Sequence, residues 1–439
     1  MSSPPCAARM NRREAIVALS TAATGATLAI AGCGRSSQQK VIKFWGAGRE
    51  GDIAAELIRG FAQEQPQIRV DVQKMPFSAA HEKLLTAYAG ETLPDVCQLG
   101  NTWIPEFAAL DALEPLNGYV SGSQEVVLDD YFDGILASNR VDQTLYGIPW
   151  YVDTRLLYYR RDLLSQAGFN EPPQTWQQWS EMLGAIKAMV GSERYSVLLP
   201  LNEFEPLLVL ALQQPSELLR DGGRWGNFRS EDFRRALTFY ESMFAQGWAP
   251  RMTNTQISNV WDEFGRGFFS FYISGPWNIA EFKKRLPASL QDHWMTATMP
   301  GPQGPGLSSA GGASLVVFKS SQAKPEAWLL AEYLSRPSVQ QRFYGLTGNM
   351  PPRRSSWALP ALVESPYARA FLAQLDRVRS PPKVPEWERI ATEMRLTGER
   401  VVQGAQPIDE AVVALDRKTD EILTKRRWML EQNTLPRGA

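Results

Sequence analysis

The chain has 439 residues and a formal net charge of −1, and 44% of its residues are hydrophobic and 21% charged. This composition is typical of a soluble globular protein with a full hydrophobic core, and the length is enough for two or three domains. The balanced charge argues against a nucleic-acid-binding protein, which usually carries a basic surface.

Residues 1–33 are predicted to be a lipoprotein signal peptide that does not belong to the fold. Arg12 and Arg13 precede a run at 15–30 that is too short and too weakly apolar for a transmembrane helix. The run ends in Ile-Ala-Gly-Cys, which resembles the bacterial lipobox, in which the cysteine, here Cys33, is acylated and becomes the mature N-terminus. The arginine pair resembles a twin-arginine signal, so two export routes stay open, as does Met10 as an alternative start.

Residues 34–40 are polar and are predicted to form a flexible tether between the lipid and the fold. Cys6 is lost with the signal and Cys33 would carry the lipid, so Cys97 is the one cysteine left to the fold. No intrachain disulfide is therefore expected, and the fold must depend on its hydrophobic core.

The rest of the chain alternates between strand-like and helix-like patterns. Predicted strands occupy 41–45, 68–72, 96–99, 156–159, 195–201, 268–274 and 313–318. Predicted helices occupy 51–64, 81–89, 106–116, 161–167, 176–190, 231–246, 325–334, 339–346, 365–378, 386–403 and 408–428. Thr175 is a candidate N-cap of the helix that follows it. This alternation predicts doubly wound α/β units, which bind ligands at loops beyond the strand ends.

Two stretches rich in Pro, Gly and Ser, at 299–312 and 347–354, are predicted to be crossovers between domains. Because they lie far from the end of the chain, they suggest a domain whose sequence is interrupted. With a first crossing near 153–158, the chain would pass three times between two lobes.

The strand predicted at 268–274 is followed by Gly275-Pro276-Trp277 and then by a helical pattern. This order places a large flat ring at the tip of a strand, where α/β sheets bind ligands. A tryptophan offers a wide apolar face and one N–H donor. Trp277 is therefore a candidate ligand platform, and packing under a loop is the alternative.

Five motifs resemble the extracellular solute-binding proteins of carbohydrate ABC importers, of the maltose/trehalose-binding kind. They occur in the family's order at 93–96 (LPDV), 146–164 (YGIP through RRDLL), 273–277 (ISGPW), 311–312 (GG) and 347–351 (TGNMP). The resemblance implies a two-lobed, periplasmic-binding-protein-like fold of type II. Each lobe would be a doubly wound sheet flanked by helices, and three hinge crossovers would join the lobes. The expected N-terminal lobe is 41–152 plus 312–348, and the expected C-terminal lobe is 153–311 plus 349–439.

A sugar-binding cleft needs flat rings for the apolar faces of the sugar, and carboxylates, amides and arginines for its hydroxyls. The chain has 14 tryptophans, several of them beside polar residues in predicted loops. The candidate ligand-binding residues are Trp45, Glu50, Asn101, Trp103, Tyr151, Asp153, Asn202, Glu203, Trp277, Gly311, Gly312 and Arg353. By resemblance, Trp277 would stack on the sugar, and Asp153, Glu203 and Arg353 would hold its hydroxyls.

Structural alternatives stand beside several of these roles. Asp153 could pair with Arg155 or cap a turn, Glu203 could favour a helix N-terminus, and Trp103 could belong to the core. Arg353 could lie on a solvated face. Asn101 also departs from the family, since relatives often have Asp there, and Ala313 stands where some relatives have Trp.

The function expected from this resemblance is binding without catalysis, with no cofactor and no metal site. A lipid-anchored protein on the outer face of the cytoplasmic membrane, or in the periplasm, would bind a neutral oligosaccharide, such as the α-linked disaccharides maltose or trehalose. It would act as a monomer, deliver the sugar to the permease subunits and touch the membrane only through the lipid on Cys33. The alternatives are a glucosylated osmolyte as ligand and a secreted glycosidase that uses Asp153 and Glu203.

Overall fold

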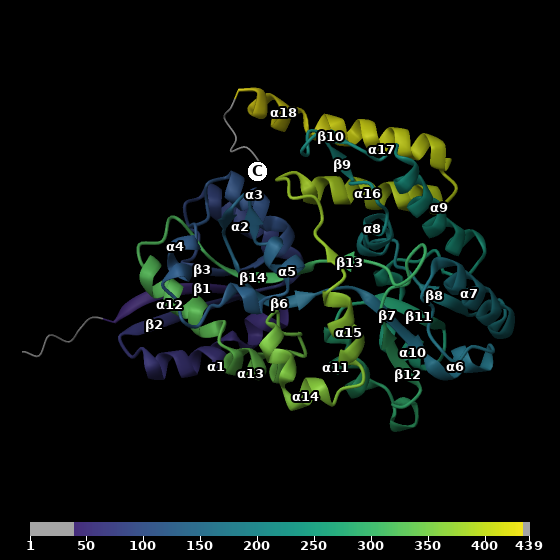
Figure 1. Ribbon diagram of the computed structural model, residues 1–439, viewed down its shortest axis with the longest axis horizontal. Helices are drawn as coiled ribbons and strands as arrows, with labels where there is room; N and C mark the ends of the chain where they lie inside the picture. Colours follow the sequence, from purple (N-terminus) through teal and green to yellow (C-terminus); the bar gives the residue numbers. More distant parts are fainter. Residues whose placement is uncertain (1–38, 433–439) are drawn as a thin grey trace, which may run out of the picture.

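The computed structural model describes residues 39–432, so the predicted signal peptide with Cys33, and residues 34–38 of the predicted tether, lie outside the described residues. Two β-sheets, each flanked by helices, lie side by side and define two lobes (Figure 1). The N-terminal part of the chain builds one lobe, and the middle and the C-terminal end build most of the other (Figure 1).

The sheet of the first lobe has five strands in the order β2-β1-β3-β14-β6. Its strands are β1 (Lys40–Ala47), β2 (Ile68–Met75), β3 (Val96–Gly100), β6 (Ile148–Asp153) and β14 (Gly311–Val317). β1 pairs in parallel with β2 and β3, whereas β14 runs antiparallel to β3 and β6. β14 thus returns to the first lobe after the chain has built most of the second, as expected for an interrupted domain.

The sheet of the second lobe has four strands in the order β12-β7-β11-β8. These are β7 (Leu156–Arg160), β8 (Tyr195–Leu198), β11 (Phe269–Ser274) and β12 (Trp294–Ala297). β11 is parallel to β8 and antiparallel to β7. Two-stranded pairs complete the strands: β4 (Arg140–Val141) with β5 (Thr144–Leu145), β9 (Leu219–Arg220) with β10 (Trp225–Gly226), and β13 (Ser308–Ser309) with β15 (Val378–Arg379).

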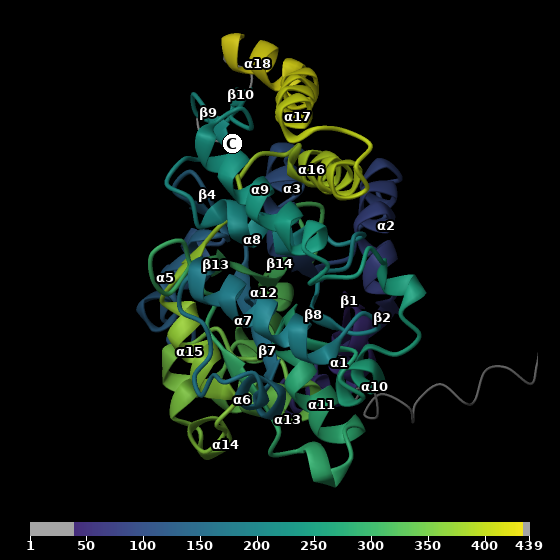
Figure 2. The same ribbon diagram turned by 90° about the vertical axis from the view of Figure 1, so that its right-hand side faces the viewer.

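Helices cover both sheets. Those of the first lobe are α1 (Gly48–Glu64), α2 (Phe77–Ala89), α3 (Ile104–Ala109), α4 (Asn117–Ser121), α5 (Asp133–Ala137), α12 (Lys324–Leu334) and α13 (Pro337–Thr347). Those of the second are α6 (Arg161–Gln166), α7 (Trp176–Val190), α8 (Glu205–Leu212), α9 (Glu231–Ala245), α10 (Val260–Gly265), α11 (Trp277–Arg285), α14 (Pro360–Val363), α15 (Ala368–Leu375), α16 (Trp387–Val402), α17 (Ile408–Ile422) and α18 (Thr424–Glu431). The C-terminal α16 and α17 pack on α8 and α9 (Figure 2).

The chain crosses between the lobes near the two glycines that begin β14. Gly311 pairs with Asp153, and Gly312 pairs with Val152. Val152 is also bridged by Met350, so the segment after α13 runs beside the other two crossings. Gly312 has φ +132°, and a Cβ there would lie 2.2 Å from the Tyr151 carbonyl oxygen. Only glycine fits this left-handed, crowded position, which explains why the crossing strand begins with it.

Most predicted elements are confirmed, and two predicted helices are wrong in their extent. Thr175 caps α7 through a capping box with Gln178, as its position suggested. The helix predicted at 106–116 ends as α3 at Ala109, and Asp111 adopts φ 55°. The helix predicted at 408–428 is divided into α17 and α18. There the Thr424 hydroxyl donates to the Asp420 carbonyl, a bond that bends helices.

Candidate ligand-binding cleft

A cavity of about 190 Å³ lies between the two lobes, where the crossings meet. The first lobe contributes the short turn η1 (Asn101–Trp103) that follows β3, and the second contributes the start of α8 and of α16. Of the twelve predicted ligand residues, the cavity is lined by Asn101, Trp103, Asp153, Gly311 and Gly312. Both lobes and the hinge therefore line one shared cavity.

The charged centre of the cleft is a row of three side chains from the first crossing, between β6 and β7, and from the start of α8. Arg155 Nε lies 3.5 Å from Asp153 Oδ1, and Arg155 Nη2 lies 2.9 Å from Glu205 Oε1. Burial alone would lower the pKa of Arg155, but the two carboxylates raise it above its ordinary value. The guanidinium is therefore held in its charged form, with a fixed orientation.

Asp153 lies at the edge of the first sheet, beside Gly311. Burial raises the pKa of its carboxyl, and the charge of Arg155 acts in the opposite direction. Its Oδ1 is buried and has no hydrogen-bond partner among the described residues. Because buried acceptors are rarely left unpaired, this oxygen is free to accept a hydroxyl of a ligand.

Trp277, the first residue of α11, lies against this row but does not line the cavity. Its ring is 4.8 Å from the Arg155 guanidinium carbon. A Cβ on Gly275 would lie 1.8 Å from the Trp277 ring and 2.6 Å from Asp153 Oδ1. Tyr158 fixes the same turn by donating its hydroxyl to the Gly275 carbonyl at 2.7 Å. Glycine at 275 therefore lets the indole reach the charged row.

The turn η1 brings a polar and an aromatic residue to the first-lobe wall. Asn101 Oδ1 accepts from the Ser314 hydroxyl at 2.7 Å, and its Nδ2 is buried without a hydrogen-bond partner in the described part of the chain. Trp103 packs against Phe77 and His81, with ring centroids 5.4 and 5.0 Å apart. Trp103 thus belongs to the lobe core and lines the cleft as well.

Glu50 and Tyr151 form a buried network beside the cleft but do not line it. Asn349 donates to Glu50 Oε1, which joins α1 to the third crossing. Gln98 accepts from the backbone N–H of Ala47 at 2.8 Å, and its Nε2 lies 3.2 Å from the Tyr151 hydroxyl. Burial raises the pKa of both Glu50 and Tyr151.

Four further candidates lie outside the cavity: Trp45, Asn202, Glu203 and Arg353. Asn254 N–H groups donate to Asn202 Oδ1 at 2.8 Å and to Glu203 Oε1 at 2.5 Å. Burial raises the pKa of the Glu203 carboxyl, and Arg155 lowers it. Trp45 lies in the core of the first lobe, with the Lys83 ammonium 5.0 Å from its ring centroid.

Arg353 was expected to hold a sugar hydroxyl, with a solvated face as the alternative, and the structure gives it other partners. Its Nε donates to Asp130 at 2.6 Å, and its Nη1 donates to the carbonyls of Glu125 and Ser335 at 2.8 and 3.0 Å. The side chain is buried in the first lobe, and it does not line the cavity. With these donors occupied, Arg353 anchors the third crossing to the loop before α5.

Glu388, in the first turn of α16, lines the cleft opposite η1 and was not among the residues predicted from the sequence. Burial raises the pKa of its carboxyl, whereas hydrogen bonding with Thr102 and the charge of His81 lower it. Its Oε1 is buried and has no hydrogen-bond partner within residues 39–432. The neighbouring Trp387 was the one sequence feature that pointed to this region, and Trp387 itself packs in the hydrophobic core of the second lobe. Phe204 and Glu205 also line the cleft, next to the predicted Asn202 and Glu203.

Within residues 39–432, no group of three or more His, Cys, Asp or Glu side chains is arranged to hold a metal ion. Over the same range, none of the helices has both the length and the apolar character needed to cross a bilayer.

Two α/β lobes with a cavity at their junction, lined by apolar surface and several charged side chains and joined by three chain crossings, define a two-lobed ligand-binding protein. Residues 56–370 match the family described as bacterial extracellular solute-binding proteins, and the chain belongs to that family. The solved structure of the sugar-binding protein MalE from Xanthomonas citri is 56% identical, with a TM-score of 0.86. The match covers 90% of this chain and 100% of that one.

Two curated relatives are similar over most of their length. The diacetylchitobiose binding protein DasA of Streptomyces coelicolor is 24% identical over 426 residues, covering 91% of this chain and 96% of the relative. The mannitol-binding protein of Pseudomonas aeruginosa is 23% identical over 392 residues, covering 83% and 88%. All three relatives are described as binding proteins, not as enzymes.

Proposed function

We propose that this protein is the substrate-binding protein of an ABC sugar importer, and that it binds a neutral oligosaccharide between its lobes. An α-linked disaccharide such as maltose or trehalose is the proposed ligand. The observation that carries the proposal is the row Asp153–Arg155–Glu205 at the lobe junction, in which Asp153 Oδ1 lies 3.5 Å from Arg155 Nε but accepts no hydrogen bond from any described residue. The 56% identity with a sugar-binding protein supports the same class of ligand.

The polar groups of the cleft suit the hydroxyl rim of a sugar. Asp153 Oδ1 and Glu388 Oε1 offer buried acceptors, and Asn101 Nδ2 offers a buried donor. A hydroxyl can donate to the first two and accept from the third. Trp277 would support the apolar face of the sugar from beside Arg155, and Trp103 would do so from the first lobe.

Binding would be coupled to the movement of the lobes. The cavity of about 190 Å³ is smaller than the roughly 300–1,000 Å³ of ordinary ligand pockets. A disaccharide therefore has to enter while the lobes are apart, and its contacts with both lobes would then favour closure. The permease subunits would recognise the closed arrangement and receive the sugar.

We propose that the protein functions outside the cytoplasm. The family consists of extracellular solute-binding proteins, and the signal predicted at 1–33 would export the chain. The lipid proposed on Cys33 would hold the protein, as a monomer, on the outer face of the cytoplasmic membrane or within the periplasm. No other part of the protein would need to touch the bilayer.

A glucosylated osmolyte is the second candidate ligand, because its polyol part is chemically similar to mannitol, the ligand in the name of one relative. A thermal-shift and calorimetric screen with maltose, trehalose, maltodextrins, mannitol and glucosylglycerol distinguishes the two. A ligand that binds only the folded state raises the melting temperature as its concentration exceeds Kd. Binding of an α-linked disaccharide, recovered intact after incubation, supports the proposal. Tight binding of the polyols alone supports the second candidate, and hydrolysis of the disaccharide would favour a glycosidase.

A further inference from the structure

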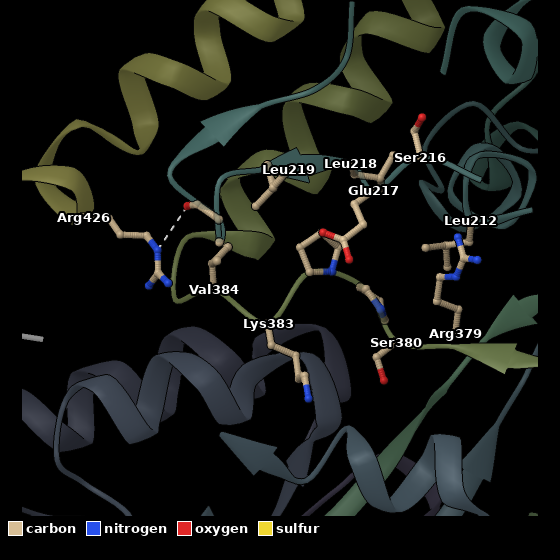
Figure 3. A pocket seen from close by; sticks show the side chains of 14 residues that line it. Leu212, Ser216, Glu217, Leu218, Leu219, Arg379, Ser380, Lys383, Val384 and Arg426 are labelled. Carbon is tan, nitrogen blue, oxygen red and sulfur yellow. Dashed lines mark hydrogen bonds between the residues drawn. The ribbon is translucent and has the colours of Figure 1, made fainter. Parts of the chain in front are cut away.

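A second cavity, of about 430 Å³, lies behind the wall of the cleft, and we call it the rear cavity (Figure 3). The segment 216–223, which contains β9 and part of the turn before β10, the segment 379–384 and Arg426 of α18 surround it. Pro381 lines both the rear cavity and the cleft, so the segment 379–384 separates the two spaces. The volume falls in the range of roughly 300–1,000 Å³ that small-molecule sites occupy.

Arg426 is the most unusual group in this wall, because its side chain is a buried cation with an unused donor. The residue is 2% exposed. Its Nε donates to the Gly223 carbonyl at 3.2 Å, and its terminal nitrogens point away from that turn (Figure 3). Nη1 is buried and has no hydrogen-bond partner among the described residues. Burial lowers the pKa of this guanidinium, and the charge of Glu386 raises it. Glu386 therefore balances part of the charge, but the buried Nη1 donor is left unused, which is costly.

Two more cations belong to the same wall. Arg379 Nη1 donates to the Gln214 carbonyl at 2.8 Å, and the Lys383 ammonium lies 3.2 Å from the Ala137 carbonyl of the first lobe. Glu217, which is exposed, is the one acidic residue of the lining. The rest of the lining is largely apolar and includes Leu212, Leu218, Leu219 and Val384. The lining therefore combines an excess of positive charge with an apolar surface.

We propose that the rear cavity is a second binding site, which takes a small organic acid with a short apolar body. Its carboxylate would lie on Arg426, and its apolar part would lie against the leucines of the β9 segment. Arginine matches a carboxylate through two parallel hydrogen bonds, which are among the stronger ones in proteins. This site is separate from the sugar site, and its test uses no sugar.

The test is calorimetric titration of the full-length protein with hexanoate, and with hexanol and inorganic phosphate as comparison probes. Hexanoate is expected to bind saturably, hexanol to bind at least about tenfold more weakly, and phosphate to bind more weakly than hexanoate. Arg426→Gln is expected to weaken hexanoate binding about tenfold or more, since it removes the charged partner. Lys425→Gln removes the same charge from an exposed neighbour on α18 and should leave the hexanoate Kd unchanged.

Glu217→Gln provides a second variant, because this exposed side chain can change without threatening the fold. It removes the acidic charge of the lining and should tighten hexanoate binding, roughly two- to fivefold.

Three results would each overturn the proposal: no saturable hexanoate binding by the unaltered protein, equal affinity for hexanol, or phosphate binding without hexanoate binding. Equal hexanoate affinity in folded Arg426→Gln, checked by circular dichroism, would overturn it too.

Discussion

The guanidinium carbon of Arg155 lies 4.8 Å from the ring centroid of Trp277, in the range of a cation–π contact. One residue follows the first chain crossing, and the other begins α11 in the second lobe. The pair therefore links the charged row of the cleft to the Gly-Pro-Trp turn, which the sequence had singled out. Three predictions depend directly on this arrangement, and a fourth concerns the buried network beside it.

Trp277→Ala is expected to weaken sugar binding by about 2 kcal/mol, or roughly thirtyfold in Kd. The change removes an apolar platform and the ring that orients Arg155. The measurement is calorimetric titration with the sugar identified by the screen. Trp428→Ala is the matched control, because Trp428 is 58% exposed on α18 and remote from the cleft. Equal affinity in Trp277→Ala and the unaltered protein would remove Trp277 from the site.

Asp153→Asn keeps the size of the side chain and removes its charge. A hydrogen bond to a charged group contributes about 1.5–3 kcal/mol, so sugar affinity should fall about tenfold or more. The same titration measures this, with Asp71→Asn on the exposed face of β2 as the control. A tighter or unchanged Kd would mean that the unpaired Oδ1 of Asp153 does not meet the sugar.

Gly275→Ala should disturb the fold and the site together. The added Cβ would lie 1.8 Å from the Trp277 ring, and overpacking of this kind costs about 1–3 kcal/mol. Denaturant unfolding should show that loss, and sugar affinity should fall as the indole is displaced.

Gly345→Ala is the matched control for Gly275→Ala. Its added methyl group meets nothing within 4 Å, because Gly345 is at an exposed position of α13. Glycine within a helix is less favourable than alanine, so the free energy of unfolding of Gly345→Ala should rise by roughly 0.5–1 kcal/mol. A Gly275→Ala protein as stable as the unaltered one would show that the turn adapts.

Glu50→Gln tests the buried carboxyl that joins α1 to the third crossing. Burial raises the pKa of Glu50 above its ordinary value of 4.5. The folded state therefore binds this proton more tightly than the unfolded state, and stability falls as pH rises from 4.5 through the folded pKa. Glutamine stays neutral and still accepts from Asn349. In the absence of sugar, the free energy of unfolding of Glu50→Gln relative to the unaltered protein should rise over that interval and then become constant.

The control for this pH series is Glu171→Gln, at an exposed loop position. The difference in free energy of unfolding between Glu171→Gln and the unaltered protein should not show the same dependence on pH. A Glu50→Gln difference that stayed flat between pH 4 and 8, or that fell, would mean that ionised Glu50 is not disfavoured in the folded state.

The sequence by itself determined most of the strands and helices, the N-cap Thr175 and the interrupted lobe to which β14 returns, but β6 and β12 had no predicted counterpart. The predicted features depend on local periodicity and on turn residues, which are encoded within a few positions of one another. Gly275 belongs here too, because the Trp277 ring, two positions later, leaves room for nothing larger. The need for glycine at 312 comes instead from the Tyr151 carbonyl of β6, which is distant in sequence.

The tertiary structure alone decided which of the marked side chains reach the cleft. Glu388 lies there because α16 begins beside η1, nearly 290 positions away along the chain, and no local sequence pattern predicts that contact. Arg353 carried the expected charge, yet its donors are satisfied by Asp130 and two carbonyls of the first lobe. Whether a polar side chain is free for a ligand depends on which distant groups already satisfy it, and only the folded chain fixes those partners.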